Sequence, residues 1–296
     1  METTQDIKQQ RLADAWAELQ AQADEGVSLQ PDSNRLAFAD PEFLLRVETR
    51  GIRFQLELLK PELGQQAAGI HHTIVVYGSA RLPSPERANE LATLAGRTHA
   101  PADIAAAKRA AKGAARYEQA RAFGRLVAEF SKTQPDTERV HICTGGGPGI
   151  MEAANRGAYD AGMPTVGLNI TLPHEQNGNP YITPGLSFKF HYFALRKMHF
   201  MMRAKALVVF PGGFGTLDEL FEVTTLVQTH KAKRVPIVLF GSDFWGQLIN
   251  FKLLVEEGMI SPEDVELMTI VDTPEAAWEA IRSFYELRND AIPVAA

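Results

Sequence analysis

Three short apolar runs, each ending in a turn rich in glycine, serine or threonine, constrain the fold of this chain more than any other feature. The runs are residues 73–77, 141–143 and 206–210, and the turns are residues 78–81, 144–149 and 211–216. Short apolar runs that alternate with helical segments are typical of a parallel sheet covered by helices on both faces. We therefore predict an α/β fold with a doubly wound parallel sheet, whose ligand binds at the carboxyl ends of the strands.

The remaining pattern predicts the other elements of this fold. Further strands are expected at 165–169, 235–240 and 268–271, and helices at 86–132 (with a break near His99), 148–161, 188–204, 216–230, 244–256 and 274–287. The loop at 171–185 is long enough to be functional. A helical segment at about 40–60 should end before Pro61. We expect an N-terminal helical extension at 1–70 and a Rossmann-like nucleotide-binding catalytic domain at 71–290.

The third turn carries the clearest chemical signal. It reads Pro-Gly-Gly-Phe-Gly-Thr from residue 211, between an apolar run and an amphipathic segment, and Glu219 follows one helical turn later. Backbone N–H groups at a helix N-terminus have no intrahelical partner and suit a phosphate. An anion site beside a carboxylate indicates chemistry on a phosphorylated substrate.

Composition limits the class of protein. The 296 residues are 45% hydrophobic and 22% charged with a formal net charge of −6, which favours a folded protein and gives no support to a nucleic-acid or anionic-membrane partner. A single cysteine, Cys143, is consistent with a reducing compartment. The N-terminus is polar, and no apolar run is long enough to span a bilayer. We expect a cytoplasmic location.

Two familiar nucleotide motifs are missing. A dinucleotide fingerprint needs glycines spaced G-x-G-x-x-G, but the third position is Ile150 in the second turn and Asp218 in the third. The strand that ends near Asn169 offers no acidic group for a ribose. No G-x-x-x-x-G-K-[ST] loop is present. These differences argue against a redox dinucleotide and against P-loop hydrolysis.

The third turn and its companions resemble a known family. Residues 211–219 match the PGGxGTxxE motif of the LOG family, the cytokinin-activating phosphoribohydrolases, which were long labelled lysine decarboxylase-like. Companion elements stand at 78–81, at 145–153 and at Arg196-Lys197-Met198. The resemblance covers roughly residues 70–285, and the N-terminal segment is similar to the extension of longer bacterial members.

The resemblance implies a modified Rossmann core that hydrolyses the N-glycosidic bond of a nucleoside 5′-monophosphate, such as AMP or a cytokinin riboside monophosphate. The products would be the free base and ribose 5-phosphate. It also implies no redox cofactor, and a homodimer or larger homo-oligomer. Many plant members have glycine where this chain has Glu152, which is expected to alter base or ribose selection. The catalytic residues implied are Arg196 and Glu219, and the expected substrate-binding residues are Ser79, Arg81, Thr144, Gly145, Gly146, Gly147, Lys197, Gly212, Gly213, Gly215 and Thr216.

Each motif also has a purely structural interpretation. Thr216 and Glu219 have the spacing of a capping box, with Thr216 as N-cap. The basic pair Arg196-Lys197 is compatible with a solvated helix face, and the glycines of the second turn with tight packing. No histidine has a partner at metal-ligand spacing, Cys143 lies in an expected buried strand, and the methionines near residue 200 fit packing or a dimer interface.

Two other functions are compatible with this fold. One is a nucleotide- or cofactor-binding protein without turnover, like the molybdenum-cofactor carriers. The presence of both Arg196 and Glu219 favours the enzyme over this alternative. The other is an amino-acid decarboxylase. The sequence shows no lysine in a motif that would bind pyridoxal phosphate, which argues against this function.

Overall fold

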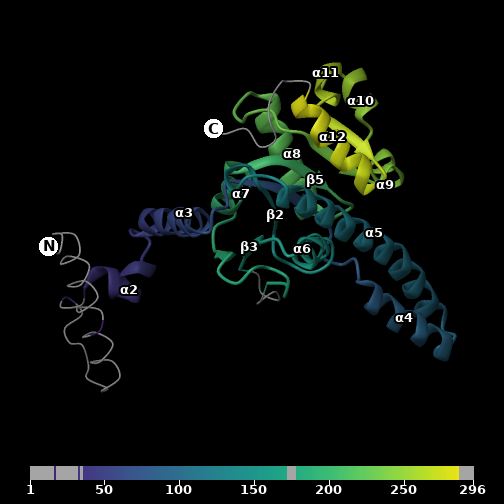
Figure 1. Cartoon of the computed structure of the whole chain (residues 1–296), viewed down its shortest axis with the longest axis horizontal. Helices are drawn as coiled ribbons and strands as arrows, with labels where there is room; N and C mark the ends of the chain where they lie inside the picture. The colour runs from purple at the N-terminus through teal and green to yellow at the C-terminus, as the bar shows by residue number, and fades with distance from the viewer. Residues whose placement is uncertain (1–16, 18–32, 34–35, 172–177, 287–296) are drawn as a thin grey trace. The chain divides into compact units, whose positions relative to one another are not determined.

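A computed structural model (Figure 1) describes residues 17, 33, 36–171 and 178–286 of the chain. The chain divides into two compact units, residues 1–56 and 57–296. The division falls within helix α3 (Arg50–Ala67), N-terminal to the boundary predicted at residue 70. The first unit contains the 3₁₀ turn η2 (Ala37–Ala39) and the short helix α2 (Pro41–Leu45), which Asp40 caps by accepting a hydrogen bond from the Phe43 N–H.

A sheet of seven parallel strands forms the centre of the second unit. Its strands follow the order β4-β3-β2-β1-β5-β6-β7, and every neighbouring pair is parallel. The chain builds outward from β1 to β4 and then returns to place β5 on the other side of β1. This reversal is the topological switch of a doubly wound sheet, so the predicted fold class is confirmed. The strand bounds are β1 (His72–Tyr77), β2 (Val140–Thr144), β3 (Thr165–Ile170), β4 (Ser187–Phe190), β5 (Ala204–Val209), β6 (Ile237–Phe240) and β7 (Met268–Val271).

Helices cover both faces of the sheet, and the residues of β1 alternate between the two hydrophobic cores. Ile74 and Val76 pack with α5 (Pro101–Lys132), α6 (Ile150–Asp160) and α12 (Pro274–Glu286). Val75 and Tyr77 belong to the opposite core, with α7 (Phe193–Met202), α8 (Phe214–Gln228) and α9 (Ser242–Leu248). Successive strand residues point to opposite faces, so one apolar run supplies both cores. The remaining helices are α4 (Pro85–Thr98), α10 (Phe251–Glu256) and α11 (Pro262–Val265).

Two predicted elements are wrong in ways that have a physical cause. Residues 188–190 were expected in a helix, but they belong to the edge strand β4, in which Phe188 and Phe190 are buried while Ser187 and Lys189 are exposed. That alternation is a strand period, which the following helical pattern obscured. Helix α3 was expected to end before Pro61, yet it continues through this proline to Ala67.

Smaller differences concern element ends and the long loop. The helix expected from residue 148 begins at Ile150, and the one expected at 244–256 is divided into α9 and α10, where Asn250 caps the second segment. The break expected near His99 is present between α4 and α5. Residues 172–177 of the loop expected at 171–185 lie outside the described residues.

Candidate functional site

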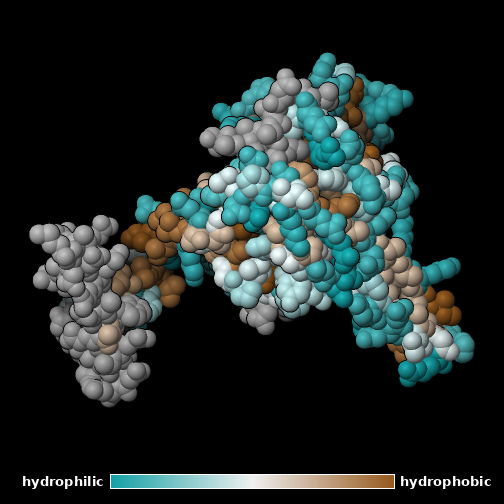
Figure 2. Space-filling view, in the orientation of Figure 1, coloured by the Kyte–Doolittle hydropathy of each residue, from teal (hydrophilic) through white to brown (hydrophobic). Residues whose placement is uncertain are grey.

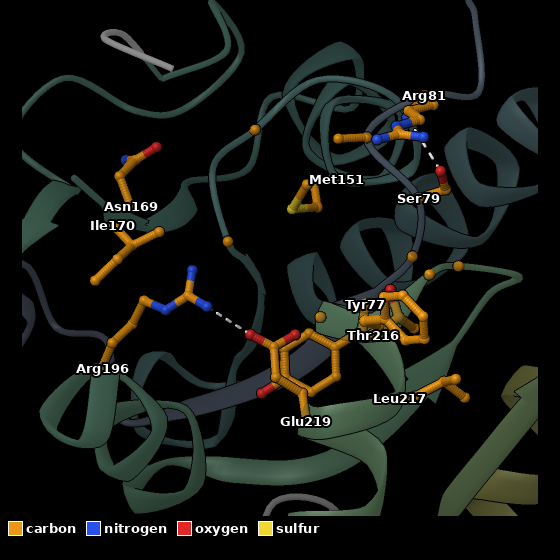
Figure 3. A pocket seen from close by; sticks show the side chains of 18 of the residues that line it. Tyr77, Ser79, Arg81, Met151, Asn169, Ile170, Arg196, Thr216, Leu217 and Glu219 are labelled. Carbon is orange, nitrogen blue, oxygen red and sulfur yellow. Dashed lines mark hydrogen bonds and ion pairs between the residues drawn. The ribbon is translucent and has the colours of Figure 1, made fainter. Parts of the chain in front are cut away.

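A cavity of about 720 Å³ lies at the carboxyl ends of the central strands (Figure 3). Its volume falls in the range of small-ligand sites, roughly 300–1,000 Å³. All three glycine-containing turns contribute to its wall, together with α7 and α8. The predicted residues that line it are Ser79, Arg81, Gly145, Gly147, Arg196, Gly212, Gly213, Gly215, Thr216 and Glu219.

Backbone hydrogen bonds join the three turns. The Ser79 N–H donates to the Pro211 carbonyl at 3.1 Å, and the Ser79 carbonyl accepts from the Ile150 N–H at 3.1 Å. The first turn therefore lies between the other two and is bonded to both. This arrangement fixes the rim of the cavity before any ligand binds.

A buried polar network holds the second turn. Thr144 donates to the Asn155 side chain at 2.7 Å and accepts from the Gly146 N–H at 3.0 Å. The Asn179 side chain donates to the carbonyls of Gly146 and Gly147 at 3.2 and 3.1 Å. Thr144 and Gly146, which were predicted to bind substrate, do not line the cavity. Thr144 instead acts on the shape of the turn, because its hydroxyl is fully buried in this network.

The third turn begins α8 in a way that leaves backbone donors open. The N-cap is Gly213, and no side chain caps this end of the helix. Thr216 already lies in the first helical turn. The capping-box interpretation of Thr216 and Glu219 is therefore wrong. The first N–H groups of a helix lack intrahelical partners, and in the described part of the chain no acceptor is bonded to the N–H groups of Phe214 to Thr216. These groups belong to residues that line the cavity.

Arg196 projects from α7 towards the cavity and pairs with Glu219 (Figure 3). Its Nη2 donates to Glu219 Oε1 at 2.7 Å, and both side chains are 11% exposed. The guanidinium carbon lies 5.3 Å from the centre of the Phe193 ring and 5.6 Å from that of Phe200. These rings fix the guanidinium plane through cation–π contacts. Its buried Nε has no hydrogen-bond partner among the described residues.

Burial raises the pKa of Glu219 from its ordinary 4.5 to about 7. The positive charge of Arg196 opposes this shift, and the negative charge of Asp218 adds to it. A carboxyl that titrates near neutral pH is typical of catalytic sites. Tyr77 lies in the same cavity, and burial together with the charge of Glu219 raises the pKa of its hydroxyl well above the usual range.

Lys197 lies outside the cavity, although it was predicted to bind substrate. Its ammonium pairs with Asp218 at 2.9 Å and with Glu222 at 2.7 Å, so that it joins α7 to α8. These two carboxylates flank Glu219 on α8. Lys197 is thus placed to influence Glu219 through charge, and its positive charge lowers the pKa of that carboxyl.

Several cavity residues were not predicted from the sequence. Tyr77, Met151, Asn169, Phe193 and Phe214 all line the cavity. Tyr77 had a usable signal, because it is the last residue of an apolar run directly before a glycine. Phe214 belongs to the third turn itself. Met151, Asn169 and Phe193 come from helices and a neighbouring strand, and their approach depends on tertiary packing.

Glu152 was expected to alter selection of the base or ribose, but it does not line the cavity. Its carboxylate accepts a hydrogen bond from the Tyr117 hydroxyl at 2.8 Å, which directs it towards α5. The preceding residue, Met151, reaches the cavity instead. Adjacent helical residues point in directions about 100° apart, which separates their roles.

The described residues offer neither a metal site nor a reactive cysteine. No three His, Cys, Asp or Glu side chains gather there in a way that could hold a metal ion. Cys143 is buried in β2, and burial raises the pKa of its thiol. Over the same residues, no helix combines the length and apolar character needed to cross a membrane.

The fold and the site define the chain as a Rossmann-type α/β protein with an arginine–glutamate pair in a cavity walled by glycine turns. A family model described as "Possible lysine decarboxylase" matches residues 151–281. A cytokinin riboside 5′-monophosphate phosphoribohydrolase of Arabidopsis thaliana is 31% identical over 153 residues, which are 50% of this chain and 67% of the relative. This chain belongs to their family, the LOG family.

Other relatives match over less of their length. A second Arabidopsis thaliana cytokinin riboside 5′-monophosphate phosphoribohydrolase is 32% identical over 136 residues, 45% of this chain and 60% of the relative. A probable one of Oryza sativa subsp. japonica is 26% identical over 153 residues, 50% of this chain and 60% of the relative. Among solved structures, the molybdenum cofactor binding protein of Rippkaea orientalis matches 72% of this chain and 96% of its own, at 19% identity and a TM-score of 0.45.

Proposed function

We propose that this protein hydrolyses the N-glycosidic bond of nucleoside 5′-monophosphates, of the AMP or cytokinin riboside monophosphate type. In this reaction the bond between ribose C1′ and the base nitrogen breaks. Water supplies the hydroxyl to C1′ and a proton to the departing base. The products are ribose 5-phosphate and the free base, and no redox cofactor or metal is required for the balance. The curated relatives reported above have names that describe this activity.

The phosphate is proposed to bind at the N-terminus of α8. The open N–H groups there and the partial positive charge of the helix end both favour an anion. A methyl group added at Gly213 or Gly215 would meet no atom within 4 Å, so nearby protein atoms do not account for these two glycines. Close approach of a ligand to the backbone gives them a purpose. Binding energy at the phosphate, remote from the breaking bond, can then orient the ribose.

The arginine–glutamate pair is proposed to carry the chemistry. Cleavage of a ribosyl bond develops positive charge on the sugar ring. The Glu219 carboxylate can stabilise that charge, hold the ribose hydroxyls or orient water, and Arg196 fixes one of its oxygens at 2.7 Å. Within the described residues no donor is bonded to the second oxygen, Oε2. The observation that carries the proposal is that this pair and the open α8 N-terminus line one cavity.

The test is a panel of nucleoside 5′-monophosphates beside the corresponding nucleosides, with released base and ribose 5-phosphate both quantified. We expect both products in equal amounts from at least one monophosphate, and a much slower reaction with its nucleoside. A control variant, Glu275→Gln, changes an exposed carboxyl in the first turn of α12 and should react at the wild-type rate.

Two results would count against parts of this proposal. Release of no base from any monophosphate, while a nucleotide binds, would favour the carrier-like alternative. Equal rates with nucleoside and monophosphate would refute the phosphate site at α8.

A further inference from the structure

Helix α7, which carries Arg196, receives its N-terminal cap from a distant part of the chain. The N-cap residue Tyr192 makes no side-chain cap of its own. Instead, the two carboxylate oxygens of Glu57 accept from the N–H groups of His191 and Tyr192, at 2.9 and 3.1 Å. Glu57 lies on α3, within the second unit. A carboxylate in this position satisfies open donors and complements the positive end of the helix.

The opposite end of α7 is held by the same helix. Arg203, the C-cap residue of α7, donates from Nη2 to Glu62 Oε1 at 2.7 Å and from Nε to the Ile70 carbonyl at 2.8 Å. Glu62 is also on α3, five residues after Glu57. The hydrogen bond from Arg203 lowers the pKa of Glu62. A charge-assisted pair of this kind is stronger than a neutral hydrogen bond.

A third contact lies between these two ends. His199 Nε2 lies 3.0 Å from the Leu58 carbonyl of α3, and its ring packs 5.3 Å from that of Phe190. Pro61 lies in the next helical turn of α3 and has no N–H, so the ladder bond that the Glu57 carbonyl would otherwise accept cannot form. The proline inside α3 therefore frees the Glu57 carbonyl, which is adjacent to the Leu58 carbonyl that His199 contacts.

The distribution of side chains on α3 indicates that these polar contacts, rather than an apolar face, attach it to α7. Leu59 and Leu63 are 49% and 57% exposed, and Figure 2 shows hydrophobic side chains on the surface in this part of the chain. Glu57 and Glu62 make the specific bonds to the residues around α7. The usual arrangement for a surface helix is the reverse, with leucines inward and carboxylates outward.

We propose that α3 is a positioning element for the proposed catalytic helix: Glu57, the Leu58 carbonyl and Glu62 hold α7 at three points, and thereby hold Arg196 against Glu219. The expected effect on rate rests on the proposed function. The three contacts that hold α7 do not depend on it. Glu57, Leu58 and Glu62 all lie in the second unit, as does α7. Glu57 is a positioning residue, since it reaches Arg196 only through α7.

The test compares Glu57→Ala, Glu57→Gln and the control Glu48→Ala in the full chain. Glu48 is exposed and lies outside these contacts. We expect Glu57→Ala to lower kcat for base release by roughly 10-fold or more, about 1.4 kcal/mol in the barrier, with a smaller change in KM. Glu57→Gln keeps one of the two acceptor oxygens and should recover part of the rate. Glu48→Ala should match the wild type.

Amide hydrogen exchange gives a readout that does not depend on activity. In Glu57→Ala, the amides at 191–196 should exchange faster, while those of the central strand β1 should be unchanged. Wild-type exchange at 191–196 together with wild-type kcat in Glu57→Ala would overturn the proposal. If the wild type hydrolyses no nucleotide, the proposed function fails and the exchange data alone decide the role of α3. Faster exchange across the whole molecule would show a general loss of stability, and would also overturn it.

Discussion

The second and third turns look alike in sequence, but their glycines are there for different reasons. In the second turn, Gly146 and Gly149 have φ values of 75° and 71°, in the left-handed region that favours glycine. A methyl group at Gly149 would lie 2.4 Å from the Ser79 carbonyl oxygen. In the third turn, Gly213 has a φ of −95°, and methyl groups at Gly213 and Gly215 would enter open space.

This difference separates glycines that the chain's own packing and backbone conformation require from glycines that they do not. The second turn is shaped by backbone conformation and by the network around Asn155. In the third turn only Gly212 is required by packing, because a methyl group there would meet Thr216 Oγ1 at 2.1 Å. The comparison predicts opposite responses to the same substitution, from glycine to alanine.

The largest effect on stability is expected in the second turn. Gly149→Ala forces a side chain into an unfavourable backbone region, with φ 71° and ψ −129°, and against the Ser79 carbonyl. We expect a loss of at least ~2 kcal/mol in the free energy of unfolding. Chemical denaturation measures it. Wild-type stability in this variant would show that the second turn is as open as the third.

A somewhat smaller loss is expected when the network behind the second turn is broken. Asn155 is fully buried, accepts from Thr144 at 2.7 Å and donates to Thr165 at 3.1 Å. Asn155→Ala leaves these groups without partners, and we expect a cost of about 1–3 kcal/mol in the free energy of unfolding. Asn89→Ala, on the exposed surface of α4, is the control and should change stability by less than ~0.5 kcal/mol.

The third turn should respond in the opposite direction. Gly215→Ala lies in the first turn of α8, where alanine is the better helix former, so stability should rise by roughly 0.5–1 kcal/mol. Affinity for a nucleoside monophosphate should nevertheless fall about 10-fold, or ~1.4 kcal/mol. Gly246→Ala in α9 is the matched control: it also has open space around it and lies outside the cavity. It should raise stability without changing affinity, and unchanged affinity in Gly215→Ala would argue against a ligand at the third turn.

The smallest effects concern pH, because they act through charge on Glu219. If the carboxylate is the active form, kcat/KM should rise with pH through about 7. Asp218→Asn removes a negative charge that raises this pKa, so the rise should move to lower pH. Lys197→Met removes an opposing positive charge and should move it to higher pH. Each shift should stay below about one pH unit, and a profile unaffected by both variants would show that another group controls the rate.

The same pKa has a consequence for stability. Folding raises the pKa of Glu219, so this group favours the folded state most below pH 4.5, and the contribution is lost as pH rises through about 7. The stability of Glu219→Gln relative to the wild type should therefore increase with pH over this interval. Denaturation at pH 4.5 and pH 8 measures the change, and a constant difference between the two proteins would contradict the raised pKa.

The sequence predicted six of the seven strands, all but β4, and most of the cavity wall, because both depend on local signals. Short apolar runs fix strands whichever neighbours they acquire, and glycine turns after them fall at one edge of a parallel sheet. The position of Lys197 could not be predicted, since it is decided by Asp218 and Glu222 on another helix. The roles of Thr144 and Glu152 depend in the same way on partners distant in sequence, Asn155 and Tyr117. The capping-box prediction failed because the N-cap of α8 is Gly213, three residues before Thr216.

The central claim is that the Arg196–Glu219 pair beside the open third turn performs the chemistry, and Glu219→Gln tests it most directly. This variant keeps the size of the side chain and one acceptor oxygen for Arg196, but removes the charge. Base release from the best nucleoside monophosphate should fall by about 10²–10⁴-fold, while binding of ribose 5-phosphate, measured by calorimetry, should be retained. A folded Glu219→Gln protein that releases base at the wild-type rate would contradict the account.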